Sequence, residues 1–359
     1  MTGAYGDGGG IAAFNRTLLS ALCELGHDVC VVSYSASESR ATEDLEWHPV
    51  SGKKALAARV LVLRSRERFD AVIIGHINLV PLAFLLPRTP YWVVLHGIDA
   101  WDSPPFFHRQ LCRRARIVSA VSDHTRQRVL RWQKTDENHV RVLPNTVDLQ
   151  RYRPTNDRVR DLRHRYRLDG EPLLLTVGRL GSAERYKGHA EVLQALPELL
   201  NRFPELIYVV AGSGDDQRRL EAVAAANGVF ERTRFLGAVP HEELPALYSL
   251  ADLFVMPSSG EGFGIVYLEA AACNTPFLAG ATDAGAEVAT ELGQPSVNAQ
   301  CREELIESLV DSLSRRAELT KGLRDRVRDR YGYAVFRSGV EKLLGVLAGN
   351  SKSSKVCRS

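Results

Sequence analysis

The sequence predicts an α/β protein of two domains, each built on a doubly wound parallel sheet, and three observations support this fold class. The length of 359 residues is typical of two domains that each bury a core of their own. With 45% hydrophobic and 25% charged residues, the composition is that of an ordinary globular protein. Short apolar runs alternate with longer helical patterns along the chain, as they do in βαβ units.

Two series of apolar runs mark the expected strands. The first series comprises DVCVVSYS, DAVIIGH, YWVVLHG, RIVSAVS and HVRVLPN, which begin at Asp28, Asp70, Tyr91, Arg116 and His139. The second series comprises PLLLTVG, ELIYVVAG, RTRFLG, DLFVMPS and TPFLAG, which begin at Pro172, Glu205, Arg232, Asp252 and Thr275. Because these runs are apolar throughout, each strand is expected to be covered on both faces, as in a parallel sheet.

The runs divide the chain into domains. Residues 1–150 form the expected N-terminal domain and residues 171–330 the C-terminal domain, with an Arg-rich linker and a short helix at 151–170. A terminal helix is expected at 331–348 and a frayed tail at 349–359. Only MTGAYGD precedes the first glycine cluster, so the first strand of the N-terminal domain is expected to be truncated or absent.

The net charge is small, but the basic residues are unevenly distributed. Forty-six Lys and Arg residues against 43 Asp and Glu leave a net charge of +3, which gives no reason to expect a nucleic-acid partner. Between Ser103 and Gly170, however, sixteen basic residues stand against seven acidic ones. These arginines either form solvated helix faces or belong to a surface that binds anions, and the sequence leaves both interpretations open.

The cysteines and the apolar runs favour a soluble protein of a reducing compartment. The six cysteines include no Cys-x-x-Cys pair, so neither a zinc cluster nor a disulfide framework is encoded. The longest apolar stretch, around Leu79 to Leu86, is too short to cross a bilayer, and Met1 to Gly10 lacks the pattern of a signal peptide. We therefore expect a cytoplasmic protein.

A run of three glycines, Gly8, Gly9 and Gly10, precedes an amphipathic helix. Glycines at a helix start let backbone amides approach a phosphate, and the helix N-terminus favours negative charge. Gly8-x-Gly10-x-x-Ala13 also fits the dinucleotide fingerprint, although no strong strand precedes it and no acidic residue ends the next strand. A plain flexible turn is an equally good interpretation of the run alone.

His96 follows the strand run YWVVL and is itself followed by Gly-Ile-Asp. Polar side chains at the carboxyl end of a parallel strand lie where ligands bind in open α/β sheets. His96 could there donate a hydrogen bond to a sugar hydroxyl or stabilise developing charge. The alternative is a buried histidine with a purely structural role.

Two cations follow the strand run PLLLTVG. Arg179 comes directly after it, and Lys187 opens the next helical segment eight residues later. Together they could grip a diphosphate, the arginine through its planar fork and the lysine as a point charge. Surface Lys and Arg residues are common, so the pair alone does not establish a diphosphate site.

The segment from Pro257 to Ala271, PSSGEGFGIVYLEAA, carries the strongest signal. It follows an apolar strand and runs into a helix, so its glycines permit close backbone approach to a ligand that faces the unpaired amides of the helix start. Glu261 lies in the loop and Glu269 on the helix. Leu268 and three alanines flank Glu269, which predicts a buried carboxylate that needs hydrogen-bond partners.

The chain contains no Asp-x-Asp motif. Transferases that hold a nucleotide diphosphate through a divalent metal usually need such closely spaced carboxylates. Cations and helix N-termini would therefore have to neutralise the phosphates here. We expect no metal site and no cofactor.

Several motifs occur in a characteristic order along the chain. They are GGG near the start, LHG at His96, LPNTVD at Leu143, VGRL and KG at Val177 and Lys187, AGSGDDQRRLE at Ala211, and EGFGIVYLEA, whose two glutamates are separated by seven residues. Together they resemble the family-four glycosyltransferases, over nearly the whole chain. The resemblance implies a GT-B-like fold, with two Rossmann-like domains that face each other across a cleft.

The resemblance also implies an activity, the retaining, metal-independent transfer of a hexose from a nucleotide-diphosphate sugar. Arg179 and Lys187 would hold the diphosphate, with help from the amides of Gly264 and Ile265. Glu269 would bind the nucleotide ribose. In the mechanism favoured for the family, the leaving phosphate takes the acceptor's proton, so no protein nucleophile is required.

Further residues receive roles from the same resemblance. Glu261 would bind the hydroxyls of the donor sugar, and His96 would lie beside its anomeric carbon or outer hydroxyl. Base contacts would come from backbone groups of the loop around Val239. The remaining residues implied to bind the donor are Gly9, Gly10, Gly178, Gly262 and Phe263.

The sequence therefore predicts a glycosyltransferase with a UDP- or GDP-linked donor and a glycan or lipid-linked acceptor. A basic stretch with aromatic residues beside it would suit peripheral contact with an anionic membrane or a lipid-diphosphate acceptor; it comprises Arg109, Arg113, Arg114 and Arg116 with Trp101, Phe106 and Phe107. Two alternatives stay open: an NAD-dependent oxidoreductase that uses the glycine run, and a non-catalytic remnant that binds nucleotide sugars.

Overall fold

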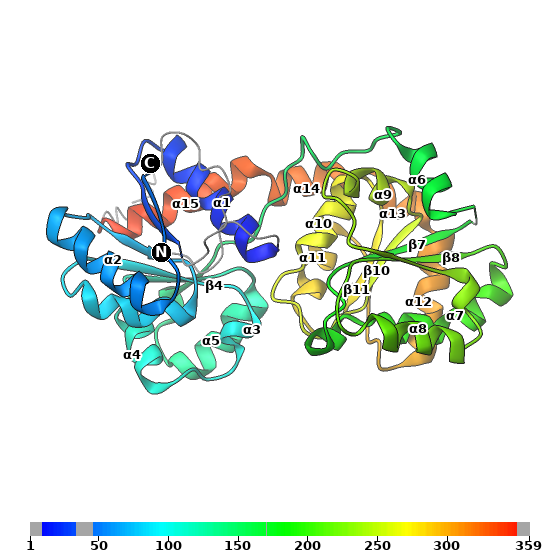
Figure 1. Cartoon of the computed structure of the whole chain (residues 1–359), viewed down its shortest axis with the longest axis horizontal. Coiled ribbons are helices and arrows are strands. Elements are labelled where there is room, and N and C mark those ends of the chain that lie inside the picture. The colour runs from blue at the N-terminus through cyan, green and yellow to red at the C-terminus, as the bar shows by residue number, and fades with distance from the viewer. Residues whose placement is uncertain (1–8, 34–45, 170, 350–359) are drawn as a thin grey trace, which may run out of the picture. The chain divides into compact units, whose positions relative to one another are not determined.

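The computed structural model of the chain describes residues 9–33, 46–169 and 171–349, which fold into two units (Figure 1). Unit 1 takes in Met1–Asn145 and Ala334–Ser359, and unit 2 takes in Thr146–Tyr333. Each unit contains a parallel sheet with helices packed against it. The predicted α/β fold class with two parallel-sheet domains is therefore confirmed.

The main sheet of unit 1 has four parallel strands in the order β3-β4-β5-β6. The strands are β3 (Val72–Ile74), β4 (Tyr91–Leu95), β5 (Ile117–Ala120) and β6 (Val140–Val142). The connecting helices are α2 (Lys53–Arg66), the 3-10 helix η1 (Ile77–Leu85), α3 (Ile98–Trp101), α4 (Phe106–Arg114), α5 (Asp123–Gln133) and η2 (Glu137–His139). All residues of β4 and β5 are buried, as expected of strands covered on both faces.

A second sheet of unit 1 pairs β1 (Cys30–Ser33) with β2 (Glu46–Pro49) in parallel. β1 is the strand predicted by the run that begins at Asp28. β2 was not predicted, because its sequence Glu-Trp-His-Pro contains no apolar run. The truncated first strand was expected within residues 1–8, which lie outside the described residues.

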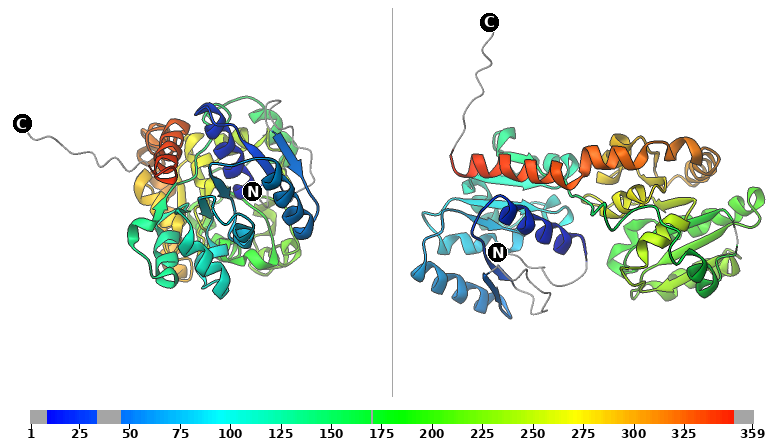
Figure 2. Two further views of the ribbon diagram at one scale, coloured as in Figure 1. Left: turned by 90° about the vertical axis from the view of Figure 1, so that its left-hand side faces the viewer. Right: turned by 90° about the horizontal axis from the view of Figure 1, so that it is seen from above.

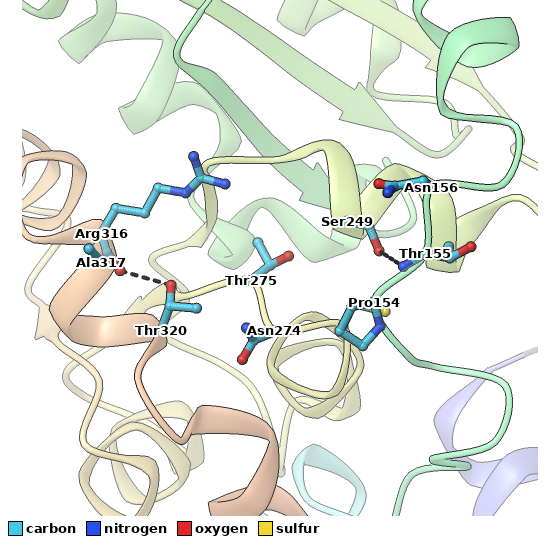
Figure 3. A pocket seen from close by; sticks show the side chains of 10 residues that line it. Pro154, Thr155, Asn156, Ser249, Asn274, Thr275, Arg316, Ala317 and Thr320 are labelled. Carbon is cyan, nitrogen blue, oxygen red and sulfur yellow. Dashed lines mark hydrogen bonds between the residues drawn. The ribbon is translucent and has the colours of Figure 1, made fainter.

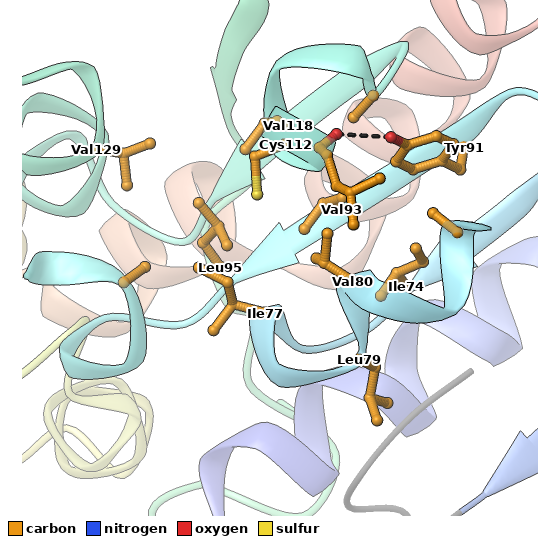
Figure 4. Close-up of a cluster of buried hydrophobic side chains, with 14 of the residues drawn as sticks. Ile74, Ile77, Leu79, Val80, Tyr91, Val93, Leu95, Cys112, Val118 and Val129 are labelled. Carbon is orange, nitrogen blue, oxygen red and sulfur yellow. Dashed lines mark hydrogen bonds between the residues drawn. The ribbon is translucent and has the colours of Figure 1, made fainter. Parts of the chain in front are cut away.

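The core of unit 1 fills the space between β4 and the helices η1 and α4. In Figure 4, Val93 and Leu95 of β4 lie near Ile77 and Val80 of η1, and all four side chains are buried. The hydroxyl of Tyr91 donates to the Leu111 carbonyl of α4 at 2.6 Å. These contacts hold β4 against η1 and α4, and His96 follows the carboxyl end of this strand.

Helices α1 (Gly10–Glu24) and α15 (Tyr333–Leu347) pack against each other in unit 1, and Figure 2 shows α15 running along this unit. The rings of Phe14 and Phe336 meet edge to face, with centroids 5.5 Å apart. Arg337 pairs with Glu24 at 3.4 Å. The last described helix is therefore part of unit 1 rather than of the unit that precedes it in sequence.

Unit 2 contains a six-stranded parallel sheet in the order β12-β11-β10-β7-β8-β9. Its strands are β7 (Leu173–Val177), β8 (Ile207–Ala211), β9 (Thr233–Gly237), β10 (Leu253–Met256), β11 (Phe277–Gly280) and β12 (Ser296–Val297). The helices before α12 are α6 (Val159–Tyr166), η3 (Ser182–Lys187), α7 (His189–Arg202), α8 (Gln217–Ala226), η4 (Phe230–Arg232), α9 (Leu244–Leu250), α10 (Ile265–Ala272) and α11 (Ala284–Leu292).

The chain after Cys301 is helical, as predicted. It forms α12 (Arg302–Ser314), α13 (Arg316–Thr320) and α14 (Leu323–Tyr331) before α15 begins. The short helix expected in the linker is α6. Every predicted strand run contains a strand, whereas the two-residue strand β12 was not predicted.

Among the described residues, no helix combines the length and the apolar character that crossing a bilayer requires.

Candidate functional site

Two loops that carry predicted site residues lie side by side in unit 2, because β7 and β10 are neighbours in the sheet. Arg179 follows β7, and Glu261 lies in the loop after β10. Lys187, at the end of η3, reaches this second loop, where its Nζ donates to Glu261 Oε1 at 2.9 Å. The structure thus brings Lys187 and Glu261 into direct contact at the carboxyl edge of the sheet.

A carboxylate that the sequence analysis did not single out, Glu184, links the two cations. Arg179 donates to Glu184 Oε1, and Lys187 Nζ lies 4.0 Å from Glu184 Oε2. The side chains of Lys187, Glu184 and Glu261 are 13%, 15% and 16% exposed, whereas that of Arg179 is 83% exposed. We call these four residues the charged cluster: two cations paired with two carboxylates, with the arginine presented to solvent.

Close backbone packing holds the two loops of the charged cluster together. The Tyr186 carbonyl accepts from the Ser259 amide at 2.9 Å. A Cβ atom at Gly260 would come within 2.7 Å of the Tyr186 ring, and one at Gly188 within 2.8 Å of Pro257. Glycine is therefore required at both positions for the loops to approach this closely.

Asp283 fixes the backbone of the loop that carries Glu261. Asp283 is the N-cap of α11, where Oδ1 accepts from the Gly285 amide at 2.8 Å. Oδ2 accepts from the amide of Glu261 at 2.7 Å. Burial raises the pKa of Asp283 to about 6. Glu261 is thus held through its backbone by α11 and through its side chain by Lys187.

Glu269 lies on α10, and the prediction that it needs hydrogen-bond partners is confirmed. The hydroxyl of Tyr248 donates to Glu269 Oε2 at 2.8 Å, and Tyr152 is a second hydrogen-bond partner. Burial raises the pKa of Glu269, and the two tyrosine hydroxyls act in the opposite direction. The two glutamates of the motif therefore differ in surroundings: Glu261 pairs with a cation, and Glu269 with hydroxyls.

The other residues implied to bind the donor in unit 2 occupy turns next to these carboxylates. Gly178 lies beneath the side chain of Lys187, whose Cδ would be 3.6 Å from a Cβ there. Gly264 caps α10, and Ile265 is its first helical residue. The ring of Phe263 is buried, with its centroid 5.6 Å from that of Tyr331, so it packs inside unit 2.

The two remaining predicted residues of unit 2 are Gly262 and Val239. Gly262 stands between Glu261 and Phe263 in the loop after β10. Val239 follows β9, the strand at the far side of β8 from β7. Its side chain is partly exposed. Among the described residues, no backbone hydrogen bond joins Val239 to the charged cluster.

In unit 1, His96 is half-buried and follows the carboxyl end of β4. Its Nε2 lies 2.9 Å from the Gly75 carbonyl oxygen, which can only accept, so Nε2 carries the ring proton. Burial lowers the pKa of His96 to about 4. The neutral ring therefore keeps Nδ1 as an acceptor, which can receive a hydrogen bond from a hydroxyl but cannot donate one as the sequence analysis had suggested.

Asp99 and His76 complete a polar group around His96. Asp99 Oδ1 accepts from the His96 amide at 3.2 Å, and Oδ2 is buried without a hydrogen bond, 3.9 Å from His76 Nε2. Burial raises the pKa of Asp99 to about 7 and lowers the pKa of His76. We call His76, His96 and Asp99 the buried polar group.

The glycine run leads directly to this group. Gly9 caps α1, and Gly10 is its first residue. One turn later Phe14 packs its ring edge to face against His96, with centroids 5.2 Å apart. Unit 1 therefore places the start of α1 and the buried polar group close to each other, while Gly8 lies outside the described residues.

One group of residues in the described chain has the composition of a metal site. Ligand atoms of Cys30, Glu46 and His48, on the paired strands β1 and β2, lie within 4.8 Å of one another. However, Arg59 donates to His48 Nδ1 at 2.6 Å, and His48 Nε2 lies 2.9 Å from Glu46. Both ring nitrogens of His48 are thus engaged, and the nearby guanidinium of Arg59 would repel a bound cation. We therefore interpret the group as a hydrogen-bonded Arg-His-Glu chain and not as a metal site.

A cavity of about 420 Å³ lies at the opposite edge of the unit 2 sheet (Figure 3). Its lining includes Thr275, just before β11, and Arg316, which pairs with Asp252 just before β10. The hydroxyls of Thr275, Ser249 and Thr320 already donate to backbone carbonyls at 2.7 to 2.8 Å. Because the cavity lies at the amino ends of β10 and β11, it is separate from the charged cluster at the carboxyl ends of β7 and β10.

Sequence models of two known families match most of the chain. The family described as "Glycosyltransferase Family 4" matches residues 8–151, and that described as "Glycosyl transferases group 1" matches residues 159–330. The first match covers most of the chain before the linker, and the second covers the sheet that carries the charged cluster.

Curated relatives are about one third identical to the chain over the part that aligns. A GDP-mannose-dependent alpha-(1-6)-phosphatidylinositol monomannoside mannosyltransferase of Mycolicibacterium smegmatis is 35% identical over 52% of this chain and 50% of its own length. A D-inositol 3-phosphate glycosyltransferase of Corynebacterium jeikeium is 33% identical over 54% of this chain and 47% of its own. The chain thus spans about half the length of the curated relatives it matches.

Solved structures share the whole fold at low sequence identity. HepE of Anabaena, in complex with UDP and glucose, is similar with a TM-score of 0.79 at 18% identity, covering 95% of this chain and 97% of that one. A sucrose-phosphate synthase of Thermosynechococcus elongatus has a TM-score of 0.78 at 20% identity, covering 97% and 98%. The chain therefore has the GT-B fold of these solved structures, and its sequence matches a glycosyltransferase family model before the linker and another after it.

Proposed function

We propose that the chain is a retaining glycosyltransferase that moves a hexose from a UDP- or GDP-linked donor to a hydroxyl of a glycan or lipid-linked acceptor. The observation that carries the proposal is the charged cluster at the carboxyl ends of β7 and β10, where ligands bind in open α/β sheets. The names of the relatives, which include a GDP-mannose-dependent enzyme, support a nucleotide-sugar donor.

In this proposal the exposed guanidinium of Arg179 and the ammonium of Lys187 hold the diphosphate. The amides at the start of α10, Gly264 and Ile265, add donors at a helix N-terminus. Glu269 then accepts hydrogen bonds from the ribose. Its carboxylate suits this role because its two tyrosine partners leave acceptor capacity on its oxygens.

The transfer step breaks the bond between the anomeric carbon and the phosphate oxygen and forms one to the acceptor oxygen on the same face. The acceptor's proton passes to the departing phosphate, so the protein provides no nucleophile. The protein's contribution is to stabilise charge on the leaving diphosphate, where each well-placed donor is worth about 2.7 to 4 kcal/mol. We propose that cations and amides do this without a metal ion.

For His96 we propose contact with a hydroxyl of the donor sugar. Its Nδ1 is available as an acceptor, because Nε2 is held by the Gly75 carbonyl. Glu261 takes the same kind of role once it releases Lys187 to the diphosphate. The oxidoreductase and the non-catalytic alternatives are not favoured, since both matched family models describe glycosyltransferases.

The test begins with binding. UDP and GDP are titrated by calorimetry and by thermal shift, in which a bound ligand raises stability by RT ln(1 + [L]/Kd). Release of UDP from UDP-glucose and of GDP from GDP-mannose is then followed with and without chelator, and in the presence of candidate acceptors. We expect one nucleotide to bind and its donor to be turned over despite the chelator; absence of binding by both nucleotides would refute the proposal.

A peripheral membrane contact is a second part of the proposal. Phe106 and Phe107 at the start of α4 are 58% and 65% exposed, and Arg114 near its end is exposed too. Apolar rings beside arginines suit an interface with anionic lipid. We expect the Phe106→Ser/Phe107→Ser double variant to lose binding to phosphatidylglycerol vesicles at low salt. Equal binding by wild type and variant would rule out this surface.

A further inference from the structure

The segment that carries Glu184 is anchored on both sides. The amide and hydroxyl of Ser182 bond to Asp215 at 2.8 and 2.7 Å, in the glycine-rich turn after β8. Arg185 pairs with the neighbouring Asp216 at 3.0 Å. On the other side, the Tyr186 carbonyl accepts from Ser259 in the loop after β10. The position of Glu184 is therefore set by the two flanking loops and not by the cations that it contacts.

The two oxygens of Glu184 have different surroundings. Oε1 accepts from Arg179. Oε2 is buried without a hydrogen-bond partner and lies 4.0 Å from the ammonium of Lys187. A buried carboxylate oxygen without a donor is costly for the fold. An arrangement that carries this cost at the carboxyl edge of the sheet points to a role for the charge itself.

We propose that Glu184 is a positioning residue, which holds Arg179 and Lys187 side by side so that both cations meet the diphosphate of the donor. The inference rests on the proposed function. Two cations that converge on one ligand repel each other, and a carboxylate between them offsets this repulsion. The exposed guanidinium of Arg179 gains a fixed orientation from the same contact.

Glu184 also differs from the other partner of Lys187. Glu261 holds the ammonium at 2.9 Å, but in the proposed function its carboxylate turns to the hydroxyls of the donor sugar. Lys187 then needs another anion to keep its place, and Glu184 is fixed to supply it. Glu184 thus acts on the reaction through Lys187 and Arg179, without touching the substrate.

The test is Glu184→Gln, which keeps the size of the side chain and removes its charge. We expect kcat for release of UDP or GDP from the donor that wild type uses to fall at least tenfold, because the cations no longer stabilise the leaving diphosphate in the right geometry. The Kd for the nucleoside diphosphate should stay equal or fall, because the variant site carries one more net positive charge. Glu184→Asp, which restores the charge, should recover part of kcat.

A matched control is Glu198→Gln on α7. Glu198 also pairs with an arginine, Arg302 at 2.6 Å, and its loss changes the net charge of the protein equally. We expect its kcat and nucleotide Kd to equal those of wild type. Melting temperatures of all variants confirm that they are folded under the assay conditions.

The outcomes separate the inference from the proposed function. If wild type binds and turns over a donor but Glu184→Gln keeps kcat within twofold, the positioning role is overturned while the proposed function stands. A parallel loss of kcat and of nucleotide affinity would also overturn it, since that result means a collapsed loop. If wild type binds neither UDP nor GDP, both proposals fall together.

Discussion

The carboxyl edges of the two sheets carry polar groups of opposite kinds. In unit 2 the charged cluster pairs two cations with two carboxylates, and Arg179 is open to solvent. In unit 1 the buried polar group has no cation, and burial moves the pKa of His96 to about 4 and that of Asp99 to about 7. Burial therefore favours the neutral form of both residues.

The difference shows how one architecture can present two kinds of chemistry. Ion pairs near the surface exchange partners readily when a charged ligand such as a diphosphate arrives, because each cation already has an anion of similar geometry. A buried neutral group instead offers fixed acceptors that suit hydroxyls. The comparison can be tested by removing one charge or one proton site at a time.

The largest effect is expected from Lys187→Ala in the charged cluster. The substitution removes one cation from the diphosphate and leaves Glu184 and Glu261 without their shared partner. By analogy with the loss of one donor to a developing charge, turnover should fall about a hundredfold to a thousandfold, or about 2.7 to 4 kcal/mol. Release of UDP or GDP from the donor measures the loss.

The control is Lys321→Ala, an exposed lysine between α13 and α14 in the same unit. The substitution also removes one positive charge, but Lys321 belongs to neither of the loops that carry the charged cluster. Turnover should therefore be unchanged. Turnover of Lys187→Ala within tenfold of wild type would show that charge recognition does not reside in this cluster.

The sequence was sufficient to locate most of the strands in both units. The runs at Pro172 and Asp252 predicted β7 and β10 because residues buried on both faces must be apolar. β2 and β12 escaped prediction because one has the mixed sequence Glu-Trp-His-Pro and the other has only two residues. Short edge strands depend on their neighbours more than on their own sequence.

The partners of the site residues could not be predicted in the same way. Glu184 lies among Arg, Tyr and Lys in a short polar segment, which is equally typical of a surface loop. Tyr152, a partner of Glu269, stands in the linker without any apolar pattern. These contacts depend on which loops the sheet order brings together, and that information is tertiary. Only the flanking alanines of Glu269 signalled in advance that it would need partners.

A smaller effect is expected from Glu269→Gln, which tests whether this carboxylate binds the ribose. Loss of hydrogen bonds to a charged acceptor should weaken binding of the nucleoside diphosphate by about 1.5 to 3 kcal/mol, which raises its Kd roughly tenfold to a hundredfold. The fold should tolerate the change, because burial already raises the pKa of Glu269 and a neutral amide suits the site. Calorimetry and thermal unfolding measure the two quantities.

Two controls sharpen this prediction. Glu205→Gln removes an exposed carboxylate that pairs with Arg232 at 3.2 Å, and it should leave nucleotide affinity unchanged. A 2′,3′-dideoxy nucleoside diphosphate, which lacks the ribose hydroxyls, should bind wild type and Glu269→Gln equally weakly. If the ratio of the two Kd values is the same for the variant as for wild type, a residue other than Glu269 binds the ribose hydroxyls.

The smallest effect concerns the buried polar group and the pH dependence of stability. The pKa of His96 is lowered by burial, so its contribution is present above pH 6.5 and lost as pH falls toward 4. The pKa of Asp99 is raised by burial, so its contribution is present below its unfolded value of 3.8 and lost as pH rises through 7. Between these values the two contributions have opposite signs and nearly cancel in wild type.

Asp99→Asn removes the Asp99 contribution to the pH dependence of stability. Lowering the pH from about 7 to about 5 should then cost the variant about 2 kcal/mol more unfolding free energy than it costs wild type, because the variant lacks the stability that Asp99 gains over this pH range. His76, whose pKa is also lowered, acts in the same direction as His96. Denaturant unfolding of both proteins at the two pH values measures this difference, in which all other titrating groups cancel. Parallel losses in both proteins would mean that Asp99 is not protonated in the folded state, and that unit 1, like unit 2, presents a charge at its sheet edge.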